Sequence, residues 1–154
     1  MKKLYIISGC NGAGKTTASY TILPELLGCK EFVNADEIAK GLSPFNPDSA
    51  NIQAGRLMLD RVQSHLKNGV SFAFETTLST KSFVKLIDEA KGLGYSISLL
   101  FFWLNSPDIA VNRVQIRVNE GGHHIPEDVI RRRYNRGIQN FFNLYKVIWT
   151  IGCS

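Results

Sequence analysis

An eight-residue segment near the N-terminus has the composition and spacing of a phosphate-binding loop. Gly9-Cys10-Asn11-Gly12-Ala13-Gly14-Lys15-Thr16 matches G-x-x-x-x-G-K-[ST] in full. In this motif the glycines permit a turn that aims backbone N–H groups at phosphate, the lysine reaches the β and γ oxygens, and the hydroxyl holds Mg²⁺. The alternative is a glycine-rich turn that matches by accident. We predict that ATP binds Gly9, Asn11, Gly12, Ala13, Gly14, Lys15, Thr16 and Thr17, that Lys15 is also catalytic, and that Thr16 holds Mg²⁺.

Asp36 is the first candidate for a general base. It follows a short predicted strand about 20 residues after Lys15, where a doubly wound sheet presents residues at its carboxyl edge beside the phosphates. A carboxylate there can take the proton of an acceptor hydroxyl during phosphoryl transfer. The alternative is that Asp36, or the nearby Asn34, only caps the following helix.

Glu75 is a second acid at the tip of a predicted strand. It ends the apolar run Val70–Phe74 and is followed by Thr76. A carboxylate in this place either holds the Mg²⁺ shell through water or accepts a hydrogen bond from substrate hydroxyls. The alternative is a solvated strand end. We predict that Glu75 and Thr76 bind the phosphate acceptor.

Arginines are concentrated in the C-terminal third of the chain. Residues 110–154 hold seven basic residues against three acidic ones, whereas residues 1–109 are nearly balanced. Arg113 and Arg117 share one face of a predicted helix, as do Arg132 and Arg136 of the next helix. Between them, Gly121-Gly122-His123-His124 has the composition of a hinge. We predict a mobile lid over about residues 113–136, with Arg117, Arg132 and Arg136 catalytic; the alternative for each arginine is a solvated polar face. The two adjacent histidines make only a weak metal site.

Strand and helix patterns alternate along the chain, which indicates an α/β fold with a mainly parallel, doubly wound sheet in a three-layer arrangement. At 154 residues, the chain has the length of one domain. Tyr95–Leu104 is predicted to include a buried strand, and Lys146–Ile151 to form a fifth one. Strands are predicted at 3–8, 31–34, 70–75, 96–104 and 146–151, and helices at 15–27, 36–40, 49–68, 81–91, 107–119 and 126–145.

Composition limits the classes of function. The 44% share of hydrophobic residues without a low-complexity tract excludes disordered and fibrous classes. The longest nearly uncharged apolar stretch is about half of the roughly 20 residues that a membrane span needs, so no membrane association is expected. Three cysteines without CxxC spacing indicate no disulfide framework and favour a cytoplasmic protein.

Several segments together resemble the zeta-toxin-like P-loop kinases. They are the phosphate loop, 32–39, 42–47 with 54–56, 74–79, and the Gly-Gly-His-x-Ile-Pro segment that leads into Arg131–Tyr134. The resemblance implies a P-loop kinase fold with a helical lid, an aspartate base at Asp36, an acceptor-binding acid at Glu75 and lid arginines that grip ATP. It also implies UDP-N-acetylglucosamine as an acceptor and a small antitoxin protein as a partner. The chain is much shorter than the plasmid-borne toxins of that family.

These observations predict an enzyme, a P-loop kinase that transfers the γ-phosphate of ATP to a hydroxyl of a small molecule, for example a nucleotide sugar. The alternative is a non-catalytic nucleotide-binding switch that acts through a protein partner. A nucleic-acid partner is not expected, because the basic residues are not interleaved with aromatic ones and no nucleic-acid-binding motif is present.

Overall fold

A parallel four-stranded sheet forms the centre of the protein, for which a computed structural model describes residues 1–146. The strand order is β2-β3-β1-β4, so the first strand lies in the interior between the third and fourth. This arrangement confirms the predicted parallel, doubly wound α/β fold. The strands are β1 (Lys3–Gly9), β2 (Phe32–Val33), β3 (Phe72–Thr76) and β4 (Ser96–Phe102).

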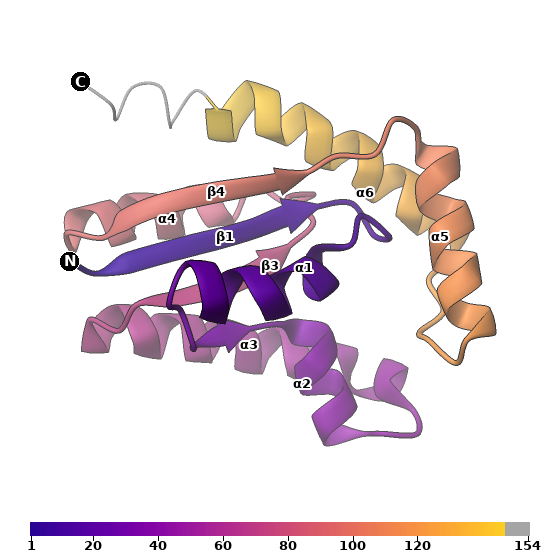
Figure 1. Cartoon of the computed structure of the whole chain (residues 1–154), viewed down its shortest axis with the longest axis horizontal. Coiled ribbons are helices and arrows are strands. Elements are labelled where there is room, and N and C mark those ends of the chain that lie inside the picture. Colours follow the sequence, from indigo (N-terminus) through magenta and orange to yellow (C-terminus); the bar gives the residue numbers. More distant parts are fainter. Residues whose placement is uncertain (147–154) are drawn as a thin grey trace.

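Helices cover both faces of the sheet, which gives the three predicted layers (Figure 1). Alternation along β1 determines the two faces: Leu4 and Ile6 enter a core with α3 and α4, whereas Tyr5 and Ile7 pack against Leu23 beside α1. The helices are α1 (Lys15–Thr21), α2 (Ala35–Leu42), α3 (Asn51–Asn68), α4 (Phe83–Gly92), α5 (Pro107–Asn119) and α6 (Glu127–Asn140). Shorter helical segments are η1 (Ile22–Leu26), η2 (Pro47–Ala50) and η3 (Phe141–Tyr145).

The carboxyl edge of the sheet gathers the residues that the sequence marks for chemistry. In the parallel register Ile7 is level with Glu75, and Val33 is level with the preceding Phe74. The phosphate loop after β1, Asn34 after β2 and Glu75 in β3 therefore end at one edge. In Figure 1 the arrowheads of β1 and β4 point toward α5, so α5 and α6 stand over this same edge.

The extents of two helices and the burial of one strand differ from the sequence prediction. Helix α2 continues to Leu42, so Gly41 lies inside it instead of ending it. The helix from Lys15 changes at Ile22 to the wider π form, whose segment contains Pro24. The predicted burial of β4 is wrong: six of its seven residues are only half-buried, because β4 is the edge strand of the described sheet.

The predicted fifth strand is not supported at its start. Lys146, where that strand was expected to begin, has right-handed helical backbone angles and ends η3. The remainder of the expected strand, 147–151, lies outside the described residues. Within 1–146, none of the helices combines the length and the apolar character needed to cross a lipid bilayer.

Candidate functional site

The phosphate loop has a backbone that depends on glycine. Gly12 has φ +80°, and a Cβ atom there would lie 3.0 Å from the Ala110 carbonyl oxygen and 3.2 Å from Cβ of Arg113. Gly12 therefore satisfies two demands at once, a left-handed backbone and close packing against α5. Gly14 also has a positive φ and precedes α1, whose first turn contains Thr16 and Thr17. The predicted loop is thus formed between a buried strand and a helix, as its motif requires.

Three side chains meet at the floor of this loop. Thr16 Oγ1 donates a hydrogen bond to Glu75 Oε2 at 2.8 Å, and Lys15 Nζ lies 3.8 Å from Glu75 Oε1. The Lys15 ammonium also donates to the Cys10 carbonyl oxygen at 2.9 Å, which turns the side chain back under the loop. Glu75 therefore contacts the proposed Mg²⁺ ligand directly. This contact favours the first of its two predicted roles, support of the metal shell, over a direct contact with the acceptor.

Burial dominates the electrostatics of this cluster. Only 6% of the Lys15 side chain and 11% of the Glu75 side chain are exposed. Burial lowers the pKa of Lys15, while the Glu75 carboxylate opposes the shift. Burial likewise raises the pKa of Glu75, against the effects of the Lys15 ammonium and the Thr16 hydrogen bond. The pair thus loses more hydration than its mutual attraction restores, and a phosphate anion beside Lys15 would supply the missing interaction.

Asn34 belongs to this cluster, although the sequence suggested only a capping role for it. Its Nδ2 donates to Glu75 Oε2 at 2.9 Å, and its Oδ1 accepts from the backbone N–H of Asp36 at 2.8 Å as the N-cap of α2. The capping was visible in the pattern Asn-Ala-Asp-Glu. The contact with Glu75 was not, because it depends on β2 lying next to β3.

Asp36 lies in the first turn of α2. The sequence left two roles open for it, a general base or the cap of this helix. Asn34 is the cap, so the carboxylate of Asp36 is not used for capping. The Asp36 side chain is exposed at the carboxyl edge of the sheet. Its charge acts on Lys15 and also on Arg133 of α6, so it lies between the phosphate loop and the arginine helices.

Two arginines of α5 and α6 contact the phosphate loop. Arg133 Nη1 donates to Asn11 Oδ1 at 3.3 Å, and Arg113 Nη1 donates to the Gly12 carbonyl oxygen at 3.5 Å. Burial lowers the pKa of Arg133, and Asp36 opposes that shift. Arg117 is exposed, yet its charge acts on both Lys15 and Glu75.

Arg133 contacts the phosphate loop, but Arg132 and Arg136 do not. Both side chains are exposed, and across residues 1–146 no hydrogen bond or ion pair joins either of them to the phosphate loop. The grouping of Arg132 with Arg136 on one helical face follows from spacing, but spacing alone does not tell which face meets the loop. Their catalytic roles remain predictions, whereas Arg133 is the residue that the sequence analysis passed over.

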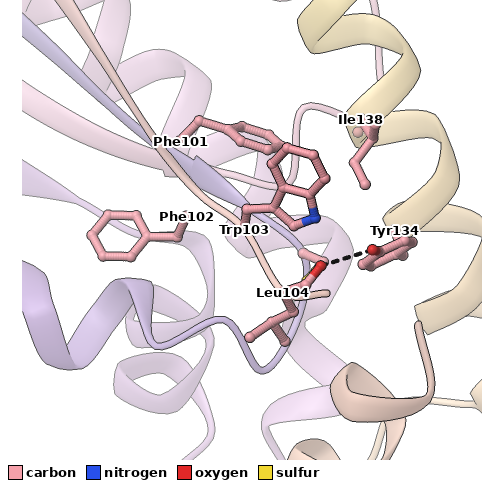
Figure 2. Close-up of a pocket in the computed structure, with 8 residues that line it drawn as sticks. Phe101, Phe102, Trp103, Leu104, Tyr134 and Ile138 are labelled. Atoms are coloured by element: carbon pink, nitrogen blue, oxygen red, sulfur yellow. Dashed lines mark hydrogen bonds between the residues drawn. The ribbon is translucent and has the colours of Figure 1, made fainter. Parts of the chain in front are cut away.

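Tyr134 determines the rotation of α6. Its hydroxyl donates to the Leu104 carbonyl oxygen at 2.7 Å, and Figure 2 shows this bond closing a small pocket between β4 and α6. Aromatic and aliphatic side chains line the pocket, with Cys10 on its loop side and no charged residue among them. With Tyr134 fixed inward, the adjacent Arg133 is directed toward Asn11.

The second half of α6 holds the segment that follows Glu75. Gly137 allows α6 to approach so closely that a Cβ atom there would lie 2.6 Å from the Thr77 carbonyl oxygen. Asn140 Nδ2 donates to the carbonyl oxygen of Leu78, a buried residue with φ +55°. The Thr76 hydroxyl, predicted to contact substrate, accepts a hydrogen bond from the Leu78 backbone N–H at 3.1 Å. Thr76 therefore shapes the turn after Glu75.

A histidine–carboxylate contact joins the tip of the arginine-bearing segment to η2. His123 Nδ1, in the loop between α5 and α6, contacts Asp48 Oδ1 of η2. Asp48 precedes α3, and α2 and α3 pack together through Ala39, Ala50 and Ala54. The segment predicted as a lid therefore touches both the phosphate loop and the α2–α3 corner.

The residues present fit a Mg²⁺–nucleotide complex. The Thr16 hydroxyl donates to Glu75 and so keeps a lone pair for a cation, while the buried Lys15 and the half-buried Arg133 provide positive charge for phosphates. In the described part of the chain no group of three or more histidine, cysteine or acidic side chains could hold a metal. Such a cage is not needed, because Mg²⁺ at phosphate sites is bound by one or two protein ligands together with the phosphates.

Comparison with known proteins gives a family match and a sequence relative. A family model described as Zeta toxin matches residues 1–147. An uncharacterized protein of Haemophilus influenzae is 31% identical over 140 residues, which cover 86% of this chain and 98% of that protein.

Solved structures share the fold. The PezAT chromosomal toxin–antitoxin system of Streptococcus pneumoniae contains a chain with a TM-score of 0.74 and 19% identity, over 96% of this chain and 65% of that one. The AvrRxo1-ORF1:-ORF2 structure with ATP gives 0.72 and 18%, over 95% and 50%. A gluconokinase from Sinorhizobium meliloti gives 0.57 and 15%, over 88% and 74%. These likenesses identify the architecture as that of P-loop kinases.

Proposed function

Because the chain belongs to the Zeta toxin family, we propose that it is an ATP-dependent kinase that phosphorylates a hydroxyl of a small molecule. The family and the P-loop kinase architecture support a phosphotransferase of this type. The observation that carries the proposal is the buried cluster of Lys15, Thr16 and Glu75 under the phosphate loop, with Asp36 at its rim. This cluster provides a phosphate-binding cation, a metal-binding hydroxyl and a separate carboxylate free for proton transfer.

Each side chain has a role in the proposed transfer. Lys15 and Arg133 bind the β- and γ-phosphate oxygens, and Arg117 adds positive charge. The oxygen of the acceptor hydroxyl bonds to the γ-phosphorus while Asp36 accepts the hydroxyl proton. At the same time the bond between the γ-phosphorus and the β–γ bridging oxygen breaks, which releases ADP. Most of the rate enhancement then comes from positioning and from charge neutralisation.

Thr16 and Glu75 are the residues that would hold Mg²⁺, which when bound neutralises phosphate charge. Glu75 does so from a fixed position, because Thr16 and Asn34 both donate to its Oε2. The carboxylate cannot rotate freely toward the acceptor. We therefore assign Glu75 to the metal shell and leave direct contact with the acceptor to groups at the rim of the cleft.

The acceptor we propose is a nucleotide sugar such as UDP-N-acetylglucosamine. The family resemblance supports this choice of acceptor. A small antitoxin protein is the partner we propose, supported by the toxin–antitoxin system among the structural neighbours.

A phosphoryl-transfer assay tests the proposal. The purified protein is incubated with ATP, Mg²⁺ and a panel of nucleotide sugars, amino sugars, nucleosides and antibiotics, and each acceptor is followed by mass spectrometry. We expect one acceptor to gain one phosphoryl group while ADP appears in equal amount, and we expect no transfer by Lys15→Ala. Nucleotide binding without acceptor-dependent ADP release, in the presence of every acceptor class, would instead support the switch that acts through a protein partner.

A further inference from the structure

Asn34 is a buried side chain that uses both ends of its carboxamide. It is 5% exposed. Its Nδ2 donates to Glu75 Oε2 at 2.9 Å, while its Oδ1 accepts from the backbone N–H groups of Asp36 at 2.8 Å and Glu37 at 3.4 Å. One residue thus joins the acid under the phosphate loop to the helix that carries the proposed base.

The chemistry of the two sides requires an amide here. The start of α2 needs an acceptor for its free N–H groups, and asparagine, aspartate and serine serve that purpose about equally well. The Glu75 carboxylate needs a donor, which neither ionised aspartate nor the short serine hydroxyl can supply while it also caps the helix. Only the carboxamide offers an acceptor and a donor on one short planar group.

The hydrogen bonds also determine how the Glu75 carboxylate is turned. Its Oε2 receives the Thr16 hydroxyl and the Asn34 amide, whereas its Oε1 lies 3.8 Å from Lys15 Nζ. Asn34 Nδ2 is also 3.5 Å from Thr16 Oγ1, so the three groups form one compact set. Without the amide, a single hydroxyl would hold Oε2, and the carboxylate could turn toward the ammonium instead.

We infer that Asn34 is a positioning residue for phosphoryl transfer, which holds Glu75 in the orientation that supports Mg²⁺ at Thr16 and holds Asp36 at the start of α2. This inference rests on the proposed function. Residues that orient metal ligands from outside typically change metal affinity by about 10- to 100-fold when they are replaced. We expect a loss of that size when the amide is removed and the cap is kept.

The test compares Asn34→Ser with the matched control Asn68→Ser. Serine keeps the cap at position 34, and Asn68 is an exposed amide at the far end of α3. ATP binding is measured by calorimetry with Mg²⁺ and with a chelator, next to thermal unfolding. For Asn34→Ser we expect a 10- to 100-fold loss of the affinity gain that Mg²⁺ provides and unchanged Mg²⁺-free ATP binding. We also expect a cooperative thermal transition, which shows that the variant is folded.

A double-mutant cycle with Glu75→Gln separates positioning from a general structural effect. If Asn34 acts through Glu75, Asn34→Ser adds little to the Mg²⁺ defect of Glu75→Gln. Additive defects, or an Asn34→Ser protein that binds Mg²⁺–ATP as the control does, would overturn the inference. Should the serine variant fail to fold, Asn34→Thr makes the same comparison, because threonine also caps and also lacks the amide.

The same measurements distinguish this inference from the proposed function. A wild-type protein that binds ATP with Mg²⁺ but phosphorylates no acceptor would contradict the proposed kinase activity and leave the role of Asn34 to be decided by the binding data. A wild-type protein that binds no ATP would overturn both.

Discussion

The floor of the phosphate loop and the arginine-bearing segment above it differ in how their polar side chains are held. Lys15, Asn34 and Glu75 are nearly inaccessible and are joined by several hydrogen bonds under the loop. The segment from α5 to α6 packs its apolar side chains against Cys10 and Ala13 of the loop. Its polar contacts with the loop are two single arginine hydrogen bonds at 3.3 and 3.5 Å, and its tip is held by the His123–Asp48 pair. The polar groups of the floor are preorganised by several hydrogen bonds, whereas the arginines of the well-packed upper segment make single, longer ones.

This difference implies a division of work. Burial deprives Lys15 and Glu75 of hydration before any nucleotide arrives, so in the proposed function phosphate and Mg²⁺ would restore interactions that folding has already removed. The arginines above are mostly exposed, so a nucleotide must order their side chains on binding. Substitutions in the floor should therefore cost much more activity than substitutions in the upper segment.

Removal of Lys15 should have the largest effect. Lys15→Ala takes away the buried ammonium that faces Glu75, and loss of one partner of a buried charged contact typically costs roughly 2–5 kcal/mol of binding free energy. We expect ATP binding to become undetectable by calorimetry and transfer to stop. Lys30→Ala, at an exposed lysine outside the loop, is the control and should behave as wild type. Equal ATP affinity of the two variants would contradict a preorganised floor.

Asp36→Asn comes next and separates chemistry from binding. The amide cannot take a proton, and loss of a general base typically lowers turnover by about 10²- to 10⁴-fold. The Asp36 side chain is exposed, and its contact with Asn34 is made by the backbone N–H, which the substitution keeps. ATP affinity should therefore stay within about twofold of wild type, well below the factor of ten that 1.4 kcal/mol represents. Steady-state kinetics and calorimetry on one preparation provide both numbers. Normal turnover in this variant would reject Asp36 as the base.

Arg133→Ala tests the upper segment against the alternative choice of arginines. A hydrogen bond to a charged group contributes about 1.5–3 kcal/mol, so turnover should fall by about 10- to 100-fold. Arg136→Ala is the matched comparison on the same helix, one turn further along and exposed, and should change turnover less. A larger loss for Arg136→Ala would mean that α6 rotates when nucleotide binds. It would support the sequence prediction that Arg132 and Arg136 face the nucleotide.

The smallest effect is expected at the surface contact between His123 and Asp48. Exposed ion pairs contribute about 0–1 kcal/mol, so Asp48→Asn should raise KM for the acceptor by no more than about fivefold and leave kcat nearly unchanged. Asp60→Asn, on an exposed part of α3, provides the control. A change in kcat of more than tenfold would show that this contact does more than hold the segment in place.

Much of the site was predictable because local sequence dictates it. A strand, a glycine-rich turn and a helix in succession place Lys15 and Thr16 in the first turn of the helix, directly after the loop. Strands that run parallel bring their carboxyl ends to one edge, which is why Asp36 and Glu75 could be expected near the loop. The helix boundaries at Ser106 and Gly69 likewise follow from capping chemistry that a few residues contain.

The remainder depended on contacts between segments far apart in the chain. Burial of β4 was overestimated because an apolar run does not tell whether a strand lies at the centre or the edge of its sheet. Arg133 was passed over because spacing determines which residues share a helical face, but the Tyr134 contact with Leu104 decides which face is turned to the loop.

The order of residues by itself determined the phosphate loop, the two acids after their strands and the alternation of strands and helices, because each is set by interactions within a few positions. Tertiary structure alone decided three contacts: Asn34 donates to Glu75, Arg133 donates to Asn11, and Thr16 donates to Glu75. Those contacts join residues 41, 122 and 59 positions apart. Strand order and helix rotation fix such distances, and both arise from how the whole core packs.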